Sequence, residues 1–268
     1  MRETRPLKHG ILPTSSHIAA TAALDNSGLS VCSITKKFAK KTVLNDVSID
    51  VRPSEVVGLL GRDGAGKTVT FHSILGLLRV NSGRIFLDGE DITGLSLDRR
   101  ALRGLGYLPQ ESSIFRGLTV EQNIMTVLEL FEADPVVRAE KLDRLLEEFH
   151  IDYVRHAPAR ALSGGERRRC EIARAMAADP TIMLFDEPFA GIDPLSVRDI
   201  KTMIANLESH DVGILITDQN VREMVGLLDR VYVLHEGRIV FDGSPDAMLE
   251  DKVVRHFYLG EEFHAPNR

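Results

Sequence analysis

Hydrophobic and polar residues alternate along residues 43–51, VLNDVSIDV, with the period of two that is typical of a strand with one solvated face. The next apolar run, residues 55–60, ends at a glycine, and a stretch of helical character follows from Lys67 to Leu77. Helical segments separate three further apolar runs, which predict strands at residues 181–186, 212–218 and 230–237. Short apolar strands that alternate with helices indicate a parallel sheet covered on both faces, so we expect an α/β fold.

A helix-rich block lies between these two groups of strands. Thr119 and Gln122 have the spacing of a capping box ahead of the apolar run IMTVLEL, and residues 133–149 form a charged amphipathic stretch. The region from about residue 111 to 178 therefore predicts a helical subdomain inserted into the sheet domain.

The two ends of the chain carry separate signals. Ser244 as N-cap, with Pro245 at the first helical position, predicts a helical tail over residues 244–268. Residues 1–27 contain basic residues and an alanine-rich patch, but polar residues and a proline interrupt the continuous apolar core that a secretion signal needs. We expect this segment to be a disordered extension, or the product of a start codon placed too early, ahead of a main domain over residues 28–243.

Composition narrows the class of protein. The 268 residues are 43% hydrophobic and 27% charged, as in an ordinary globular chain, and the net charge of −6 argues against general binding to nucleic acid. No uncharged apolar stretch approaches the roughly 20 residues that span a bilayer, so any membrane role would depend on partners. Cys32 and Cys170 fit neither a disulfide framework nor a metal cluster, and we expect both to be inert packing residues.

The sequence GRDGAGKT, residues 61–68, is a phosphate-binding signature between a predicted strand and a predicted helix. Gly61, Gly64 and Gly66 allow the backbone to curl so that successive N–H groups face a nucleotide's phosphates. Lys67 would reach the β and γ phosphates, and the Thr68 hydroxyl would ligate magnesium. The other residues of this predicted binding loop are Arg62, Asp63, Ala65 and Val69.

TIMLFDEP supplies the second half of a nucleotide hydrolase. An apolar strand places Asp186 at its carboxyl end, where it can hold the water shell of magnesium, and Glu187 can take a proton from the attacking water. Gln110, in GYLPQE, closes another short strand with a side chain able to touch both metal and water. By itself each run is a weak signal, but together with the phosphate loop they predict a nucleotide and Mg²⁺ as the bound groups.

A second anion-binding pattern lies at LSGGERRRCEIARAM, residues 162–176. Ser163, Gly164 and Gly165 stand at the start of a strongly helical run, where short side chains leave the N–H groups of the first turn open to a phosphate. Ser163 as an ordinary helix cap is compatible with this interpretation, because the same groups can be capped in one state and bridged by phosphate in another. One chain therefore carries two phosphate-binding patterns.

Together these motifs, in this order, resemble the ATP-binding-cassette ATPases from about residue 29 to the end of the chain. The resemblance implies a P-loop NTPase fold, with a RecA-like parallel sheet core, an antiparallel β subdomain and an inserted helical subdomain. It also implies that the signature loop at Ser163 of one subunit closes on the γ phosphate held by another, so that two copies of the chain sandwich two ATP molecules. This arrangement would explain why one polypeptide carries both patterns.

Several positions differ from the family pattern or have a second interpretation. Phe38 matches the position where the family stacks an aromatic ring on adenine, although it could instead be a core residue near a strand end. Gln219 stands where the family has a histidine that grips the γ phosphate, so we expect slowed but real turnover. Arg62, Asp63 and Val69 replace the Pro, Asn and Thr usual in the family's loop, and we expect only modest changes in affinity.

The longer stretches GYLPQESSIFRGLTV, DEPFAGIDPLSV, ITDQNVREM and FYLGEEF are most similar to the ATPase subunits of lipopolysaccharide export transporters. That resemblance implies two copies beneath two transmembrane permease subunits on the cytoplasmic face of the inner membrane, with lipopolysaccharide as indirect substrate. Phe115 and Arg116 would contact the permease helices, although a core phenylalanine and a solvated arginine are the alternative. The alternative functions are a branched-chain amino acid importer ATPase and a soluble cassette ATPase acting on nucleic acid or the ribosome.

Overall fold

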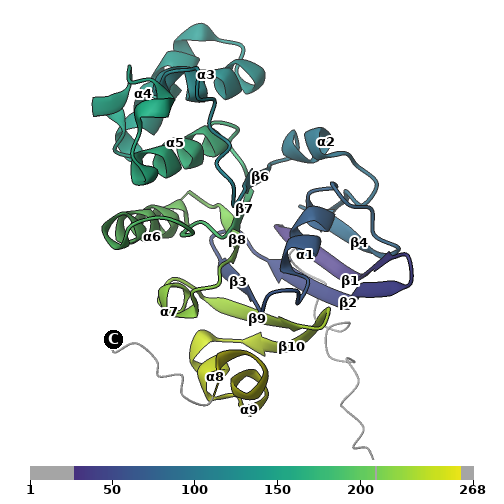
Figure 1. Ribbon diagram of the computed structural model, residues 1–268. Coiled ribbons are helices and arrows are strands. Elements are labelled where there is room, and N and C mark those ends of the chain that lie inside the picture. The colour runs from purple at the N-terminus through teal and green to yellow at the C-terminus, as the bar shows by residue number, and fades with distance from the viewer. Residues whose placement is uncertain (1–26, 209, 261–268) are drawn as a thin grey trace, which may run out of the picture.

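The computed structural model describes residues 27–208 and 210–260, and its core is a six-stranded sheet (Figure 1). The strands lie in the order β10-β9-β3-β8-β7-β6 and all neighbours run parallel except β10, which pairs antiparallel with β9. Their bounds are β3 (Val56–Leu60), β6 (Leu105–Leu108), β7 (Ile182–Asp186), β8 (Gly213–Thr217), β9 (Arg230–His235) and β10 (Arg238–Gly243). The predicted α/β fold with a parallel core is confirmed.

Both faces of this sheet are covered, as the uninterrupted apolar strands predict. In β7 all residues are buried, and successive side chains enter different cores. Met183 and Phe185 pack with helices α3 (Val120–Phe131), α5 (Gly164–Met176) and α6 (Pro194–Glu208). Ile182 and Leu184 pack on the other face with α1 (Lys67–Ile74) and a second sheet, and Figure 1 shows α6 and α1 on opposite sides of the central strands.

The second sheet is antiparallel, in the order β2-β1-β4-β5. Its strands are β1 (Leu29–Phe38), β2 (Lys41–Val51), β4 (Ser82–Leu87) and β5 (Glu90–Asp91), followed along the chain by the short helix α2 (Leu97–Ala101). Leu29 pairs with Val51 on one side and with Leu87 on the other, and all three side chains are buried. The strand expected at residues 43–51 is therefore the larger part of β2.

Helices α3, α4 (Pro135–Glu148) and α5 gather at one end of the molecule (Figure 1). The predicted capping box of α3 is present, because Thr119 Oγ1 accepts from the Gln122 N–H at 3.2 Å while Gln122 Oε1 accepts from the Thr119 N–H at 2.9 Å. The amphipathic stretch expected at residues 133–149 forms α4. Two short 3-10 turns, Asp152–Val154 (η1) and Ala159–Ala161 (η2), lead from α4 to α5. The assignment of residues 111–178 as a separate subdomain stays a prediction.

The helix expected from Lys67 to Leu77 is shorter in the structure. It ends at Ile74, because the buried Arg100 guanidinium donates to the carbonyl oxygens of Ser73 and Ile74 at its last turn. Gly76 then reverses the chain with φ of 78°. A cation on the last carbonyls of a helix complements the negative end of its dipole, so Arg100 fixes where α1 stops.

After the short helix α7 (Val221–Met224), the chain returns through β9 and β10 to the tail. Ser244 caps α8 (Pro245–Glu250) as predicted, since its Oγ accepts from the Ala247 N–H at 3.2 Å. A further helical turn, α9 (Lys252–Val254), continues into a π-helical turn over Arg255–Leu259, labelled η3. The rest of the predicted 244–268 tail, and all but the last residue of the predicted 1–27 extension, lie outside the described residues.

The two cysteines differ from each other. Cys170 is a residue of α5 and is fully buried in the hydrophobic core, as expected of a packing residue. Cys32 is exposed, so its interpretation as a packing residue is wrong: it lies on the solvated face of the antiparallel sheet.

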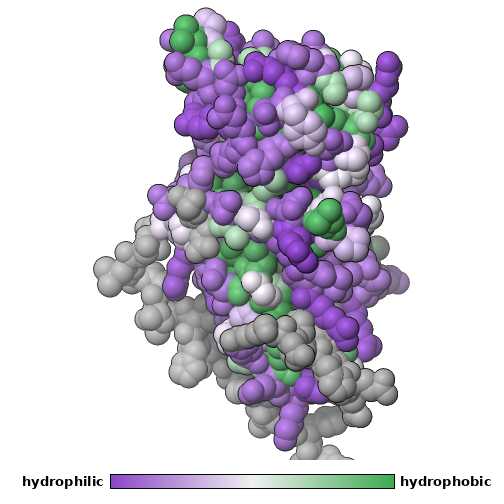
Figure 2. Space-filling view, turned by 90° about the vertical axis from the view of Figure 1, so that its left-hand side faces the viewer, coloured by the Kyte–Doolittle hydropathy of each residue, from purple (hydrophilic) through white to green (hydrophobic). Residues whose placement is uncertain are grey.

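No helix within residues 27–208 and 210–260 is long and apolar enough to cross a bilayer. Figure 2 shows the face on the α6 side, which is mostly hydrophilic with hydrophobic residues in small groups.

Candidate functional site

Four loops that carry predicted site residues begin at the carboxyl ends of neighbouring parallel strands. Gly61 follows β3, Gln110 follows β6 by two residues, Asp186 ends β7, and Gln219 follows β8 by two residues. Because β3, β8, β7 and β6 are consecutive in the sheet, their carboxyl ends form one edge. This is the edge where open α/β sheets bind ligands.

The phosphate loop connects β3 to α1 through glycine backbone conformations that other residues rarely adopt. Gly66 has φ of 116°, and a Cβ there would lie 2.8 Å from a methyl carbon of Leu44. At Gly61 a Cβ would lie 2.3 Å from the Leu234 carbonyl oxygen. Helix α1 has no acidic residue in its first turn and no side-chain cap, so its N-terminal N–H groups face the loop with their dipole uncompensated. This geometry suits a polyphosphate.

Lys67 is buried at the start of α1 and lies back across the loop. Its ammonium Nζ donates to the carbonyl oxygens of Gly61 at 2.6 Å and Arg62 at 3.3 Å. The Thr68 hydroxyl is exposed beside it, while Val69 is half-buried and packs against the core under the sheet. The side chains of Arg62 and Asp63 are exposed, which agrees with their expected position outside the backbone cradle.

Asp186 is a buried carboxylate at the end of β7, and the Tyr107 hydroxyl donates to its Oδ2 at 3.4 Å. Burial, and then the neighbouring Glu187 carboxylate, raise the pKa of Asp186 above its ordinary value. A divalent cation would offset this desolvation. The Asp186 carboxylate, Thr68 hydroxyl and Gln110 carbonyl are all hard oxygen donors, so the residues present fit Mg²⁺.

Glu187 is held by two glutamines, one on each carboxylate oxygen. Gln110 Nε2 donates to Glu187 Oε2 at 2.6 Å, and Gln219 Nε2 donates to Oε1 at 3.1 Å. The Glu187 backbone has φ of 44°, a left-handed conformation fixed by its N–H bond to the Thr217 carbonyl at 2.8 Å. The three residues predicted to be catalytic are therefore in direct contact.

A cavity of about 280 Å³ adjoins this cluster and is lined in part by Glu187, Asp218 and Gln219. Asp218 is buried and accepts from the Asn220 N–H at 2.8 Å and the Phe189 N–H at 3.4 Å, which ties the end of β8 to the turn after Glu187. Burial raises the pKa of Asp218 above its ordinary value. The rest of the lining includes Phe189, Ile192 and Val197, so the cavity has an apolar part and a polar part, and the polar part gives room for water beside a carboxylate base.

The signature loop is capped by a side chain of the helix that it begins, α5. Ser163 is the N-cap of α5, and Glu166 closes a capping box with it: Ser163 Oγ accepts from the Glu166 N–H at 3.3 Å, while Glu166 Oε2 accepts from the Ser163 N–H at 2.8 Å. A Cβ at Gly164 would meet nothing within 4 Å, whereas one at Gly165 would lie 2.4 Å from Ser196 Oγ. The loop thus packs closely on α6 at Gly165 and opens outward at Gly164.

The phosphate loop and the signature loop belong to different parts of the molecule. Figure 1 shows α5 among the helices at one end and α1 on the other side of the central sheet. Among the described residues, no hydrogen bond joins residues 61–68 to residues 163–166. The structure of one chain therefore does not bring the two predicted phosphate sites together.

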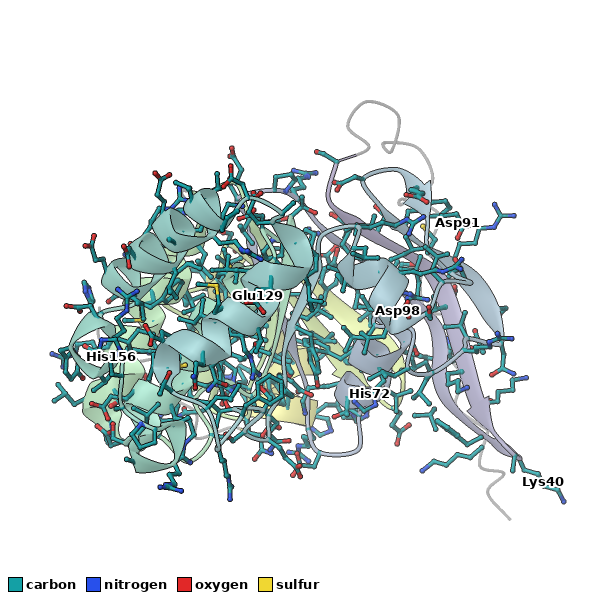
Figure 3. All side chains as sticks on the ribbon, turned by 90° about the horizontal axis from the view of Figure 1, so that it is seen from above. Lys40, His72, Asp91, Asp98, Glu129 and His156 are labelled. Carbon is teal, nitrogen blue, oxygen red and sulfur yellow. The ribbon has the colours of Figure 1, made fainter. Side chains whose placement is uncertain are left out.

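Phe38 ends β1 and its ring is 43% exposed, so its alternative interpretation as a core residue is wrong. The Lys36 ammonium lies 5.0 Å from the ring centroid, a cation–π contact that holds one face of the ring. In Figure 3, Lys40 marks the outer tip of the β1–β2 hairpin next to Phe38, and His72 on α1 lies between this hairpin and the helical end. The contact of Phe38 with adenine stays a prediction.

Phe115 is also exposed rather than a core residue, with 51% of its surface accessible. Its backbone N–H and carbonyl both bind the side chain of buried Asn123, at 2.9 and 3.1 Å, and the Arg174 guanidinium lies 4.8 Å from its ring centroid. Arg116 is exposed, as both of its interpretations expected. Phe115 is thus an aromatic side chain held outward by a rigid backbone, which is the form of an interface anchor.

Two buried charged residues of α5, Arg168 and Glu171, connect these loops and are not among the residues predicted from sequence. Arg168 Nη1 donates to the Pro109 carbonyl at 2.8 Å, and its Nε donates to the Pro188 carbonyl at 3.2 Å. It therefore holds the residue before Gln110 and the residue after Glu187.

Glu171 lies one turn along α5 from Arg168, and the two side chains are 3.3 Å apart. One Glu171 oxygen accepts from the Ser112 hydroxyl and from the N–H groups of Ser113 and Ile114, at 2.7, 2.8 and 3.1 Å. The helical period would have indicated both residues, because Arg168 lies four positions before buried Ile172 and Glu171 lies three after Arg168.

Comparison with known proteins gives a consistent result. The sequence model of the ABC transporter family matches residues 44–190. A probable ABC transporter ATP-binding protein of Azorhizobium caulinodans is 53% identical over 247 residues, which are 92% of this chain and 87% of that protein. The lipopolysaccharide export system ATP-binding protein LptB of Haemophilus influenzae is 51% identical over 231 residues, 86% of this chain and 96% of that protein.

Among solved structures, the chain is similar to the ADP conformation of MJ1267, an ATP-binding cassette of an ABC transporter, with a TM-score of 0.78. The two sequences are 26% identical, and the match covers 87% of this chain and 99% of that one.

Proposed function

The chain belongs to the ATP-binding-cassette (ABC) transporter family, and from this premise we propose that it is the ATPase that powers lipopolysaccharide export from the inner membrane. It binds ATP and hydrolyses it, as the family does. The finer assignment is supported by the relative that carries the name of a lipopolysaccharide export ATP-binding protein and shares about half of its residues over nearly its whole length.

The observation that carries the catalytic part is the contact of Glu187 with both Gln110 and Gln219 at the edge that begins with the phosphate loop. In the proposed reaction, backbone N–H groups of residues 61–68 and the Lys67 ammonium hold the phosphates of ATP. Glu187 accepts a proton from the water that attacks the γ phosphate. Gln219 donates its amide to the γ phosphate and orients that water with its carbonyl oxygen.

Magnesium, when bound by Thr68, Asp186 and Gln110, would neutralise charge on the phosphates. Gln110 can serve both groups, because its amide Nε2 donates to Glu187 while its carbonyl oxygen would be the metal ligand. One side chain would therefore connect the base to the metal.

The working unit that we propose is a dimer in which each ATP lies between the phosphate loop of one copy and the signature loop of the other. Among the described residues of one chain no hydrogen bond joins these loops, so in this proposal a second copy brings Ser163, Gly164 and Gly165 to the phosphates held by Lys67. The N-terminus of α5 supplies N–H donors and the positive end of a helix dipole to the γ phosphate.

We also propose that two transmembrane permease subunits bind this dimer at Phe115 and Arg116 and hold it against the cytoplasmic face of the inner membrane. Phe115 is exposed, and its backbone is bound to Asn123 and its ring to Arg174. Arg174 and Glu171 of α5 both contact the loop at Ser113, so the proposed permease contact is tied to the signature helix. Closure of the dimer would move this contact and the permease with it.

The test is purification of the tagged chain from membranes in a mild detergent. We expect it to bring two transmembrane subunits with it, and the reconstituted complex to release lipopolysaccharide from vesicles only with ATP and Mg²⁺. Glu187→Gln is the matched control, because it keeps the shape of the site but removes the base. Retention of ribosomes or DNA in place of membrane subunits would overturn the assignment, and so would ATP-driven transport of an amino acid by the complex.

A further inference from the structure

The first turn of α5 contains a negatively charged side chain, the carboxylate of Glu166. Glu166 Oε2 accepts from the Ser163 N–H at 2.8 Å and from the Ser163 hydroxyl at 2.6 Å. These two donors lie at the N-terminal end of α5, where the proposed function brings the γ phosphate of a second copy. In the isolated chain, a carboxylate of the same helix is therefore bound to the donors that the phosphate would use.

The other oxygen of this carboxylate is held from a different direction. The Tyr153 hydroxyl donates to Glu166 Oε1 at 2.8 Å, and Arg169 Nη2 donates to the Tyr153 oxygen at 3.3 Å. Tyr153 belongs to η1, ahead of the signature loop, and its side chain is 66% exposed. Glu166 is thus bound to two sets of partners, Ser163 on one oxygen and Tyr153 with Arg169 on the other.

These contacts keep Glu166 charged. Hydrogen bonds from Ser163, and after them from Tyr153 and the charge of Arg169, lower the pKa of the carboxyl. Two anions cannot share the Ser163 donors without strong repulsion, because like charges a few ångströms apart repel even near a protein surface. A phosphate that binds Ser163 must therefore displace the Glu166 carboxylate from it.

We propose that Glu166 is a placeholder for the partner's γ phosphate at the signature loop, and that Tyr153 is the positioning residue that retains the displaced carboxylate. The inference rests on the proposed function, in which Ser163 binds the nucleotide of a second copy. When phosphate takes the Ser163 donors, the hydrogen bond from Tyr153 stabilises a carboxylate that has lost its other partner. Closure of the dimer is then opposed by Glu166 and assisted by Tyr153.

The two roles predict opposite effects of two conservative substitutions. Glu166→Gln removes the charge but keeps an amide oxygen that can accept from the Ser163 N–H, so α5 stays capped while the phosphate meets a neutral competitor. Tyr153→Phe removes only the hydroxyl and leaves a displaced carboxylate without its donor. With glutamine at 166 there is no charge to retain, so the Tyr153 substitution loses its effect.

The experiment measures dimerisation of the full chain with ATP and Mg²⁺ by sedimentation, in a Glu187→Gln background that does not hydrolyse ATP. We expect Glu166→Gln to tighten the dimer roughly fivefold and Tyr153→Phe to weaken it roughly fivefold, the effect of about one hydrogen bond. Tyr153→Phe added to Glu166→Gln is expected to change nothing further. Thr126→Val, which removes a hydroxyl that donates to the Asn123 carbonyl within α3, is the control for loss of a hydroxyl elsewhere.

Binding of a fluorescent ATP analogue to the monomer separates this role from a general loss of structure, because Glu166 and Tyr153 lie in the signature region and not in the phosphate loop. We expect its affinity to be the same in all variants. If Glu187→Gln alone forms no dimer with ATP, the proposed function fails. If it does form a dimer, but Glu166→Gln does not tighten it or Tyr153→Phe weakens it equally with either residue at 166, only the present inference fails. If Glu166→Gln does not fold, the Tyr153→Phe variant decides alone. A dimer of that variant as tight as the dimer of Glu187→Gln without it overturns the inference.

Discussion

Glu187 connects the other two proposed catalytic residues, because Gln110 and Gln219 each donate to one of its carboxylate oxygens. Its role as base, and those of Gln110 and Gln219, were predicted from motifs that lie about 30 to 80 residues apart in the sequence. The hydrogen bonds that join them could not be predicted, because they depend on β6, β7 and β8 being neighbours in the sheet. The sequence shows where each strand ends, but the order of strands follows from packing of the whole sheet.

Gln219 provides a test at this scale. We expect Gln219→His to raise the maximal rate of ATP hydrolysis about fivefold, because an imidazolium would replace a neutral donor to the γ phosphate and contribute about 1 kcal/mol more to the transition state. The measurement is steady-state ATPase activity across pH 5–8. The original protein should show no imidazole titration from this position, whereas the variant should gain one near the ordinary pKa of histidine, about 6.5. Equal profiles for the two proteins would contradict a role for residue 219 at the γ phosphate.

The cysteines give a second test. Burial raises the pKa of the Cys170 thiol to about 12, and burial with the nearby Asp50 charge raises that of exposed Cys32. Because alkylation needs the thiolate, we expect Cys32 to react slowly at pH 7, faster as pH rises, and Cys170 to react only after unfolding. Mass spectrometry should find one adduct per folded chain and two in denaturant, since the sequence has 2 cysteines. Rapid labelling of Cys170 in the folded protein would show that α5 opens far more readily than its packing implies.

Among the elements, α5 connects the signature loop to the loops that carry Gln110 and Glu187. It begins at the signature loop, buries Cys170 and Ile172 in the core, and uses Arg168 and Glu171 to hold the loops after β6 and β7. The Arg168 guanidinium is 5% exposed and lies beside a Glu171 that is 3% exposed. The Arg168 side chain therefore links α5 to the backbone next to Gln110 and Glu187 through hydrogen bonds of 2.8 and 3.2 Å.

We expect Arg168→Met to lower the free energy of unfolding by about 2 kcal/mol and to reduce ATP hydrolysis more than ATP binding. The substitution leaves the buried Glu171 charge without its cation and frees the carbonyl oxygens of Pro109 and Pro188. Urea denaturation gives the first quantity, and nucleotide titration beside turnover gives the second. Arg144→Met, an exposed arginine on α4, is the control and should change neither. A variant as stable as the control would show that Arg168 contributes no net stability.

The elements themselves were predicted unequally. Strands β3, β7, β8 and β9 were found because each is a short apolar run with fully or mainly buried residues. Helix α1 was predicted three residues too long, because its end depends on Arg100, which lies 26 positions beyond Ile74. Partner strands β1 and β4 were not assigned bounds, since their pairing joins residues as distant as Leu29 and Leu87. The local pattern of apolar residues predicts that an element exists, whereas contacts with residues far away in the sequence determine where it ends.

At the scale of the whole molecule, the phosphate loop and the signature loop are on separate parts of the chain, and we propose that two chains combine them. This proposal predicts complementation. Lys67→Ala removes the phosphate-loop cation, and Gly164→Asp places a negative charge in the signature loop. The latter side chain has free space around its Cβ and suits the N-terminus of a helix, so the fold should be kept. Each variant alone should lose at least about 100-fold in ATPase activity.

A mixture of the two variants should regain part of the activity, because one site of a mixed dimer combines the intact loop of each partner. The measurement is ATPase activity as a function of the mixing ratio at constant total protein, with maximal activity near equal amounts. Mixing either variant with more of itself is the control and should restore nothing. The shared site is falsified if the mixture stays as inactive as its components while sedimentation shows that mixed dimers form.

The two glutamines that bind Glu187 also bear on how the protein behaves between transport events. Both oxygens of the base are engaged by neutral amides, and a water molecule must compete with them for a place on the carboxylate. An unassembled copy would then consume its nucleotide slowly even when saturated with it. A cell could hold surplus copies of this subunit with little waste of metabolic energy, and consumption would become fast where assembly with the membrane components frees Glu187 from the glutamines.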